Sequence, residues 1–420
     1  MSGIFSENDK KIIQALAARY REIAESPENA LHIKRAYNTN DLGGGRPFVS
    51  IEELPWNELN FEGILDCRCE HEFARDMEMF FRRELYRWDY FRVDHIFYPD
   101  YYIPKAFDTS DMGISVHQKT LATDIDNPIV SHCYIDILPD EASLEQMHNM
   151  VVTPRPDLDA ERMEMAGELL GGIMNPRLIG MTYNYFAPWD DLVQYHGVEN
   201  TYIDLIDRPE FMHAMIDKYI DIHLDYLDQL EKYDLLGDFR QAKLHCTASH
   251  TTLLPHKEEG EHITTQDMWT RATAQPFGSC SPEDYHDFEI AHMDRVMQRF
   301  GLVYYGCCEP LDHVIPYLKK YPKVRKIGVS PFADIELCAE QIGKDYVLSR
   351  KPHPAYVANR FSADVVRGEL RQTEDICTKY GCSYDYTLKD ISTVDHDPRH
   401  IFEWARVITE ELDRYYGTDC

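Results

Sequence analysis

Apolar residues recur along the chain at two spacings, and the spacing changes near residue 90. Between residues 7 and 26 they return every three or four positions, which predicts an amphipathic helix with Ser6 as its N-cap. The region 51–87 continues in a mostly helical style and is rich in aromatic and charged residues. We therefore expect the chain to open with an N-terminal helical extension over residues 1–85.

From about residue 90 short β-rich runs alternate with longer helical ones. The predicted strands are 93–98, 129–130, 178–185, 242–246, 302–305, 324–329, 346–349 and 383–386. The predicted helices are 209–233, 282–299, 335–342, 362–380 and 398–416. This alternation is typical of an α/β fold and predicts a (β/α)8 TIM barrel over residues 86–420. A doubly wound open sheet is the rival, but no G-x-G-x-x-G motif follows an early strand.

Composition narrows the classes of partner and compartment. The 420 residues carry 43 basic and 73 acidic side chains, a formal charge of −30. Such a charge argues against nucleic acid or an anionic membrane as a partner. The chain has no leader-like start and no uncharged run of about 18 residues. Its eleven cysteines are irregularly spaced, unlike a secreted disulfide framework. We expect a cytoplasmic protein.

The densest candidate chemistry follows the strand 302–305, where Cys307, Cys308 and Glu309 precede Pro310. In parallel α/β folds the carboxyl ends of strands hold the active site. Because side chains alternate along a strand, Tyr305, Cys307 and Glu309 should share one face, unless a twist or bulge turns Cys308 inward instead. A thiolate and a carboxylate on one face suit zinc. Alternatively, both cysteines are small buried hydrophobes and Glu309 lies on the surface.

Several motifs follow one another in an order that resembles a known family. They are His196-Gly197-Val198-Glu199-Asn200, the run 204–210, Gln275 with the run 281–285, the strand before Cys307, and the run 381–398. Over roughly residues 85–420 they resemble the uroporphyrinogen decarboxylase superfamily, and most closely its cobalamin-dependent methyltransferase branch. The resemblance implies a TIM barrel with its active cavity at the carboxyl ends of the strands, as the alternation predicts.

The resemblance also implies a metal site. Methyltransferases of this family hold zinc with a His-x-Cys pair and a distant cysteine, and these positions fall on Tyr305, Cys307 and Cys382. Tyrosine is a rare zinc ligand, so the sequence departs from the family here. The implied ligands are Cys307 and Cys382, with Glu309 or His245 in place of the missing histidine. Glu309 and Tyr305 are the expected catalytic residues.

Two further segments are candidates for substrate binding. Tyr183, Tyr185 and Trp189 follow a predicted strand, and their aromatic faces would suit a methoxylated ring. Lys351 and His353 lie after another strand and could meet a carboxylate of the substrate or a corrinoid side chain. The alternatives are plain core packing for the aromatic residues and a solvated surface turn for the charged ones.

The function implied by the resemblance is a zinc-dependent methyltransferase that moves a methyl group from a methoxylated small molecule to cob(I)alamin. No D-x-H-x-x-G motif for cobalamin occurs, so the cofactor should arrive on a partner corrinoid protein. Residues 1–85 could cover the barrel or form a homodimer interface. One alternative is a decarboxylase of a tetrapyrrole or other acid, which lacks support because residues 40–50 hold only Arg46 as a cation. The other is a non-catalytic corrinoid or tetrapyrrole binder.

Overall fold

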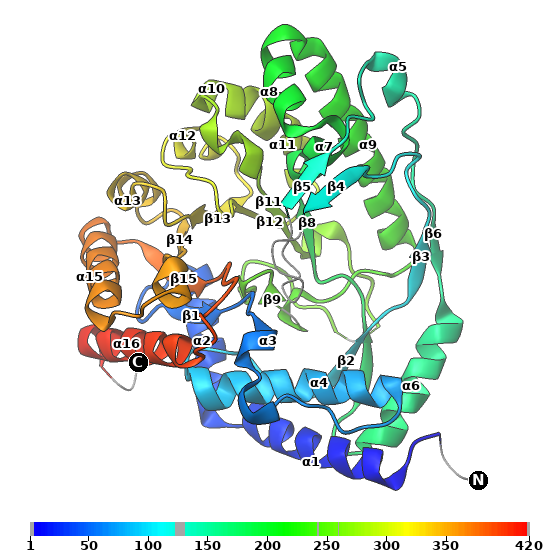
Figure 1. The fold of residues 1–420 in the computed structure, drawn as a ribbon, viewed down its shortest axis with the longest axis vertical. Helices are drawn as coiled ribbons and strands as arrows, with labels where there is room; N and C mark the ends of the chain where they lie inside the picture. The colour runs from blue at the N-terminus through cyan, green and yellow to red at the C-terminus, as the bar shows by residue number, and fades with distance from the viewer. Residues whose placement is uncertain (1–3, 122–130, 242, 259, 418–420) are drawn as a thin grey trace.

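The structure is a computed structural model that describes residues 4–121, 131–241, 243–258 and 260–417, so the predicted strand 129–130 lies outside the described residues. Its centre is a seven-stranded parallel sheet curled as a half-barrel, with β1 and β8 at the two edges (Figure 1). In sheet order the strands are β1 (Phe48–Ile51), β15 (Ser383–Leu388), β14 (Val347–Arg350), β13 (Val324–Val329), β12 (Leu302–Tyr305), β11 (Trp269–Ala272) and β8 (Tyr183–Phe186). The α/β class is as predicted, and what the described strands form is half of a barrel.

Helices cover the outer, convex face of this sheet, where the largest apolar core lies. Each connection between neighbouring strands is long enough to hold a helix, as parallel pairing requires. The helices that follow the first 150 residues are α6 (Pro156–Leu170), α7 (Pro188–His196), α8 (Val198–Asp207), α9 (Pro209–Lys232), α10 (Pro282–Tyr285), α11 (Ala291–Met297), α12 (Ile315–Leu318), α13 (Ile335–Ile342), α14 (Ala355–Ala358), α15 (Ala363–Tyr380) and α16 (Arg399–Tyr416). A π-helix, His286–Ile290, joins α10 to α11.

The first 85 residues are helical apart from one strand. Their helices are α1 (Glu7–Ala24), α2 (Pro27–Asn40), α3 (Trp56–Leu59) and α4 (Glu72–Tyr86). Ser6 caps α1 as expected, because its side chain accepts a hydrogen bond from the Asp9 amide. However, β1 also belongs to this segment and pairs in parallel with β15. The predicted extension therefore supplies an edge of the main sheet as well as helices.

The concave face of the sheet is occupied by a short hairpin, β9 (Lys243–Leu244) and β10 (Thr247–Ala248). Figure 1 shows β9 inside the arc formed by the sheet strands. Hydrogen bonds tie the hairpin to three strands: Ser50 Oγ donates to the Cys246 carbonyl, Thr247 Oγ1 donates to Asp385, and Lys326 donates to Thr247 Oγ1. The hairpin tip, His245-Cys246, therefore lies near the carboxyl ends of the strands.

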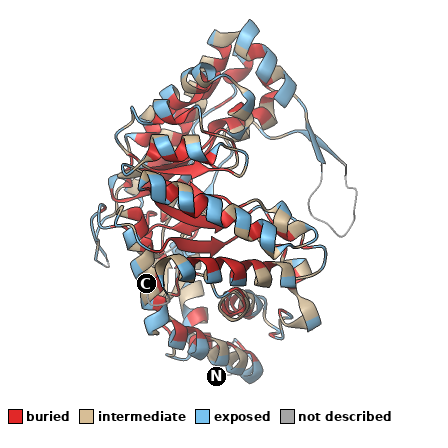
Figure 2. Ribbon diagram, turned by 90° about the vertical axis from the view of Figure 1, so that its left-hand side faces the viewer, coloured by how far each residue is buried: buried red, intermediate tan, exposed pale blue. Residues whose placement is uncertain are grey.

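Smaller elements flank the half-barrel beside β8. They are the parallel pair β2 (Tyr101–Pro104) and β7 (Pro176–Ile179), the antiparallel pair β3 (Phe107–Thr109) and β6 (Val152–Pro154), the antiparallel pair β4 (Gln118–Leu121) and β5 (Ser131–Tyr134), and helix α5 (Glu141–Leu144). In Figure 2 an exposed two-stranded ribbon projects from the body, whose sheet is buried on both faces. None of the helices in the described ranges is long and apolar enough to cross a membrane.

Candidate functional site

A carboxylate, an imidazole and a thiol meet at the tip of the hairpin. The ligand atoms of Glu53, His245 and Cys246 all lie within 4.8 Å of one another. Glu53 Oε1 is 3.4 Å from His245 Nε2 and accepts a hydrogen bond of 3.1 Å from the Cys246 thiol. His245 has a left-handed backbone, with φ of 40°, which turns the two adjacent side chains toward the same carboxylate. Glu53 lies two residues after the end of β1, so two distant segments build this cluster.

Two further thiols lie next to this group, at the carboxyl end of β12. The sulfurs of Cys307 and Cys308 are 3.5 Å apart, and the Cys308 thiol is 3.1 Å from Asp390 Oδ2. The Cys308 thiol holds the pKa of Cys307 well below its ordinary value, and His245, Arg271 and Lys389 act in the same direction. The same contact raises the pKa of Cys308. Of the two thiols, Cys307 is therefore the one whose surroundings favour the thiolate form.

The residues that follow β15 also contact this group. Lys389 Nζ lies 3.2 Å from Glu53 and 3.1 Å from Asp390, and it is almost fully buried. Burial alone would raise the pKa of Glu53, but contacts with His245, Asp390 and Lys389 bring it far below its ordinary value. Glu53 is therefore ionised at neutral pH and can act as a metal ligand.

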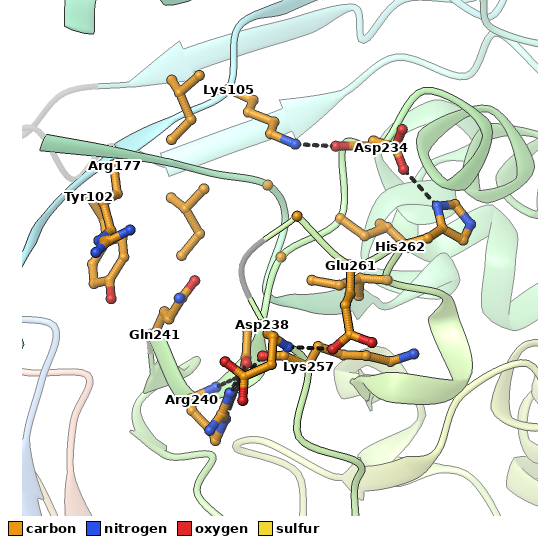
Figure 3. A pocket seen from close by; sticks show the side chains of 18 of the residues that line it. Tyr102, Lys105, Arg177, Asp234, Asp238, Arg240, Gln241, Lys257, Glu261 and His262 are labelled. Carbon is orange, nitrogen blue, oxygen red and sulfur yellow. Dashed lines mark hydrogen bonds and ion pairs between the residues drawn. The ribbon is translucent and has the colours of Figure 1, made fainter.

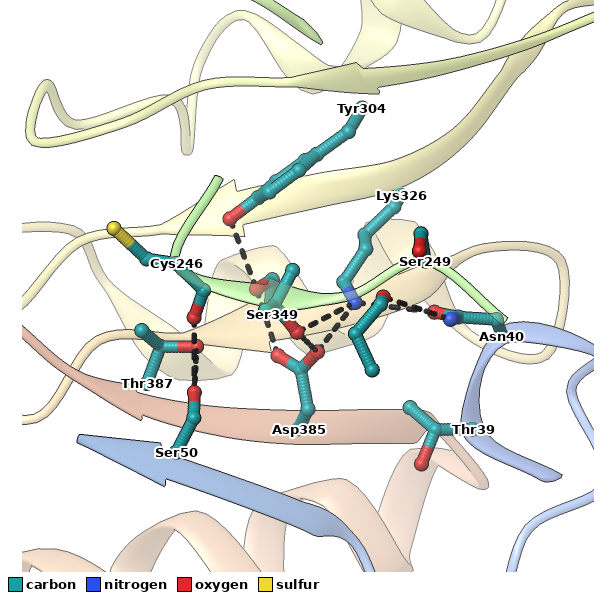
Figure 4. A network of polar contacts seen from close by, with 12 residues as sticks. Thr39, Asn40, Ser50, Cys246, Ser249, Tyr304, Lys326, Ser349, Asp385 and Thr387 are labelled. Carbon is teal, nitrogen blue, oxygen red and sulfur yellow. Dashed lines mark hydrogen bonds and ion pairs between the residues drawn. The ribbon is translucent and has the colours of Figure 1, made fainter. Parts of the chain in front are cut away.

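Beneath the hairpin tip the concave face holds a buried polar network (Figure 4). Lys326 forms an ion pair with Asp385, and both side chains are about 1% exposed. Ser349 Oγ donates to Asp385 at 2.7 Å, and Lys351 Nζ donates to Tyr304 Oη at 2.5 Å and to Ser349 Oγ at 2.6 Å. Burial lowers the pKa of Lys351 to about 8. Charges of both signs thus line the inside of the sheet.

Tyr305 does not point into the site, which corrects one expectation. Its hydroxyl is 3.4 Å from both Tyr285 Oη and Glu289 Oε1, on the convex side under the helices. The neighbouring Tyr304 faces inward instead. Gly306, with φ of 101°, breaks the strand alternation, so Tyr305 and Cys307 end on different sides.

Glu309 is buried and engaged by hydrogen bonds. Its carboxylate accepts from the Cys307 amide at 3.0 Å, from Thr273 Oγ1 at 2.5 Å and from Tyr285 Oη at 3.2 Å. Burial raises its pKa, and the Cys307 charge raises it further. Glu309 therefore braces the loop that carries Cys307. Among the described residues, the group with metal-ligand spacing contains Glu53 rather than Glu309.

Cys382 lies far from Cys307, which corrects the expectation that the two thiols share an ion. Cys307 follows the carboxyl end of β12, whereas Cys382 precedes Ser383, the first residue of β15. The strands are parallel, and β15 alone is about 20 Å long at 3.3 Å per residue. Cys382 therefore lies at the amino ends of the strands, opposite to Cys307. Its thiol is buried there and contacts the Ala339 carbonyl at 3.5 Å.

The expected substrate residues fall into different places. Tyr183 and Tyr185 line an open hollow of about 480 Å³ beside β8, and Tyr185 stacks on His245 with ring centroids 5.0 Å apart. Trp189 is fully buried and its indole donates to the Phe288 carbonyl, so it packs in the core. Lys351 points into the buried network rather than into solvent. His353 packs between Phe332 and Tyr356, away from the thiols.

A second hollow, of about 650 Å³, is lined mostly by polar and charged residues, among them Arg240 and Gln241, which precede the hairpin in the chain (Figure 3). Its charges are largely paired. Asp238 binds Arg240, Asp100 binds Arg177 at 2.5 Å, and His262 binds Asp234 at 2.6 Å. It shares Tyr102, Ile179, Gly180 and Gln241 with the hollow beside β8, so the two are continuous.

Sequence reasoning missed several residues of the site: Glu53, Cys246, Arg271, Lys389 and Asp390. The run Phe48-Val49-Ser50-Ile51 before Glu53 is a short series of β-formers and could have marked β1. Lys389 and Asp390 lie three and four residues after the predicted last strand, 383–386, and come directly after β15 as the structure has it. No protein-family model matches this chain, and no curated protein matches it either.

Proposed function

We propose that this protein is a corrinoid-dependent methyltransferase. It takes a methyl group from a methoxylated small molecule, an aromatic methyl ether, and passes it to cob(I)alamin on a partner corrinoid protein. The observation that carries the proposal is the group Glu53, His245 and Cys246 at the carboxyl ends of a curled parallel sheet, beside the adjacent thiols of Cys307 and Cys308. In α/β folds such positions hold reactive groups.

Zinc fits this donor set. A carboxylate oxygen, an imidazole nitrogen and a thiolate sulfur are its usual protein ligands, and three protein ligands are typical of catalytic zinc. Glu53, His245 and Cys246 would hold the ion, with Cys307 close by. Bound zinc would act as a Lewis acid that makes a methoxy oxygen a better leaving group or a thiol a better nucleophile.

Asp190 is the residue that we assign to hold a proton for the departing oxygen. It lies on the first turn of α7, after β8, and its carboxylate accepts hydrogen bonds from the backbone and side-chain amides of Gln275 at 2.9 and 2.7 Å. Burial raises its pKa to about 7, and the charges of Glu309 and Cys307 act in the same direction. A carboxylic acid with such a pKa is suited to general acid catalysis.

The proposed function also implies a proposal about the fold. We propose that the half-barrel is a (β/α)8 barrel of the uroporphyrinogen decarboxylase type, interrupted between β8 and β1. Met181, two residues before β8, forms a parallel bridge with Leu236. A cytoplasmic location and a homodimer belong to the same proposal.

Metal analysis and a methyl-transfer assay test the proposal together. Purified wild-type protein should contain about one zinc per chain, and Cys246→Ser should lose most of it. Cys382→Ser is the matched control, because it removes a buried thiol at the amino ends of the strands and should keep the metal. Wild-type protein given cob(I)alamin and a methoxylated aromatic should form methylcobalamin. Equal zinc in the three proteins, or no methyl transfer across a donor panel with the corrinoid protein supplied, would end the proposal.

A decarboxylase of a carboxylic acid is the second candidate. The buried cations Arg271, Lys326 and Lys351 on the concave face favour an acidic substrate for either reaction. Release of carbon dioxide from a tetrapyrrole or aromatic acid, without methyl transfer, would identify this activity instead.

A further inference from the structure

Arg271 is a buried arginine whose hydrogen-bonding capacity is largely unused. It lies on β11, faces the concave side and is 0% exposed. Its guanidinium stacks on the rings of Tyr304 and Tyr185, with 4.5 and 5.7 Å to their centroids, and Nη2 donates to the Gly306 carbonyl at 2.9 Å. Within the described parts of the chain, Nε and Nη1 have no hydrogen-bond partner. Buried donors normally find acceptors, so this guanidinium is prepared for a group that comes from outside.

Positive charge exceeds negative charge around it. Three cations surround the Tyr304 ring: the Arg271 guanidinium, and the ammonium groups of Lys326 and Lys351 at 5.6 and 5.2 Å from its centroid. Asp385 is the only carboxylate of the described residues that forms an ion pair with any of them. By geometry, these three cations therefore have one carboxylate partner among the described residues. Because unpaired buried charge is unfavourable, one further anion is the expected occupant.

The hollow beside β8 lies close to Arg271, with the ring of Tyr185 between them. The hollow beside β8 opens on the incomplete side of the half-barrel and is lined by aromatic and aliphatic side chains, among them Tyr102, Met181 and Tyr183. Tyr185, one of its lining residues, is 39% exposed although its ring contacts the guanidinium. A single aromatic side chain therefore separates the hollow from Arg271. A flat ring with one anionic substituent matches this combination of surfaces.

We propose that Arg271 binds the carboxylate of an aromatic acid whose ring occupies the hollow lined by Tyr183 and Tyr185. Arginine is suited to this task because its planar donors match carboxylate geometry. The proposal deepens the proposed function by defining the substrate as an acid, and it rests on that function for the reaction but not for binding.

Calorimetric titration tests the subsite with 4-methoxybenzoate and its neutral counterpart, 4-methoxybenzyl alcohol. Wild-type protein should bind the acid more tightly. Arg271→Gln should bind the acid about ten- to hundred-fold more weakly, the size expected for lost hydrogen bonds to a charged group. The alcohol should bind both proteins equally, and Arg271→Lys should recover part of the loss. Arg240→Gln, in the large charged hollow, is the matched control and should bind the acid like the wild type.

Two outcomes would overturn the subsite: equal binding of the acid to wild type and Arg271→Gln, or loss of binding in Arg240→Gln. If the Arg271 variants fail to fold, the wild type alone decides, because the acid must raise its melting temperature more than the alcohol does at equal concentration. Binding that depends on Arg271 without methylcobalamin formation supports the subsite and contradicts the methyltransferase proposal.

Discussion

The two faces of the same seven strands carry opposite kinds of residue. On the convex face, side chains such as Leu348, Ile327 and Val303 belong to one continuous apolar core with the helices. On the concave face the alternate positions of the same strands hold Lys326 and Asp385, buried as deeply. Neighbouring residues on a strand point to opposite sides of the sheet. The same strands therefore carry an apolar face and a charged face.

This difference between the faces indicates that the convex face provides most of the stability and the concave face the groups for binding. Apolar burial on the convex side gains free energy in proportion to the area removed from water. The buried ion pair on the concave side gains little net stability, because desolvation offsets the attraction between its charges. A buried ion pair of this kind therefore needs a role other than stability. Here Lys326 and Asp385 bind the hairpin through Thr247, on the same face as Arg271. Mutations on the two faces should therefore behave differently.

Removal of one partner from the concave network should have the largest effect. Asp385→Ala leaves Lys326 buried without its carboxylate and also removes an acceptor from Ser349 and Thr247. We expect a loss of about 3–5 kcal/mol in the free energy of unfolding, measured by urea denaturation.

The double variant Lys326→Met/Asp385→Leu is the control for this prediction. It replaces both charges with apolar side chains and should unfold within about 1–2 kcal/mol of the wild type, on either side. A double variant as unstable as Asp385→Ala would mean that the network itself holds the sheet together, and the contrast between the faces would fail.

On the convex face a truncation should cost nearly as much and for a different reason. Leu348→Ala removes a fully buried side chain from the main core. We expect a loss of about 3 kcal/mol in the free energy of unfolding from lost burial and the cavity left behind. Val365→Ala on the exposed side of α15 is the matched control and should change stability by about 0.5 kcal/mol or less. A small effect of Leu348→Ala would contradict the view that the convex face provides the stability.

The sequence predicts the elements of this sheet better than the orientation of its side chains. Helix α13 and strands β12 and β13 have the predicted bounds, because each has a strong local pattern. Strand β1 was missed because four residues between a glycine loop and acidic residues give a weak signal. Its omission hid Glu53, which follows it.

Side-chain orientation depended on backbone geometry that no pattern reveals. Positive φ at Gly306 separates Tyr305 from Cys307, and positive φ at His245 turns that residue and Cys246 toward Glu53. The pairing of Cys307 with Cys382 relied on sequence spacing, and the position of Cys382 before β15 overrides it. His245, which the family resemblance suggested as a ligand at the end of a β-rich run, does lie beside Glu53 and Cys246.

A pH experiment sharpens the comparison on the convex face. His223 is buried there, stacked on Phe186 with ring centroids 3.7 Å apart and bonded to Asn184 at 3.1 Å. Burial lowers its pKa from 6.5 to about 3. Below pH 6.5, His223 binds a proton in the unfolded chain but stays neutral in the folded protein. The free energy of unfolding therefore falls as the pH drops toward 3.

At pH 5 this histidine should lower the free energy of unfolding by about 2 kcal/mol relative to pH 7, since each pKa unit is worth about 1.4 kcal/mol. His223→Gln keeps a polar side chain opposite Asn184 but cannot titrate. The loss of stability between pH 7 and pH 5, followed by urea denaturation, should be smaller in the variant by that amount. An identical loss in both proteins would show that the folded state accommodates the charged imidazole.

The smallest stability effect should come with a functional one, on the concave face. Ser50 Oγ donates to the Cys246 carbonyl at 2.9 Å and so holds the hairpin tip on β1. Ser50→Ala should cost about 1 kcal/mol of unfolding free energy, as for one hydrogen bond, yet weaken zinc binding because the tip that carries His245 and Cys246 loses its support. Ser383→Ala is the matched control: Ser383 also points inward and donates to a backbone carbonyl at 2.9 Å, but at the amino end of β15, far from the tip. Zinc titration with a chelator should separate two variants of similar stability. Equal zinc affinity in both would mean that the concave face does not position the metal ligands, and its polar residues would need another explanation.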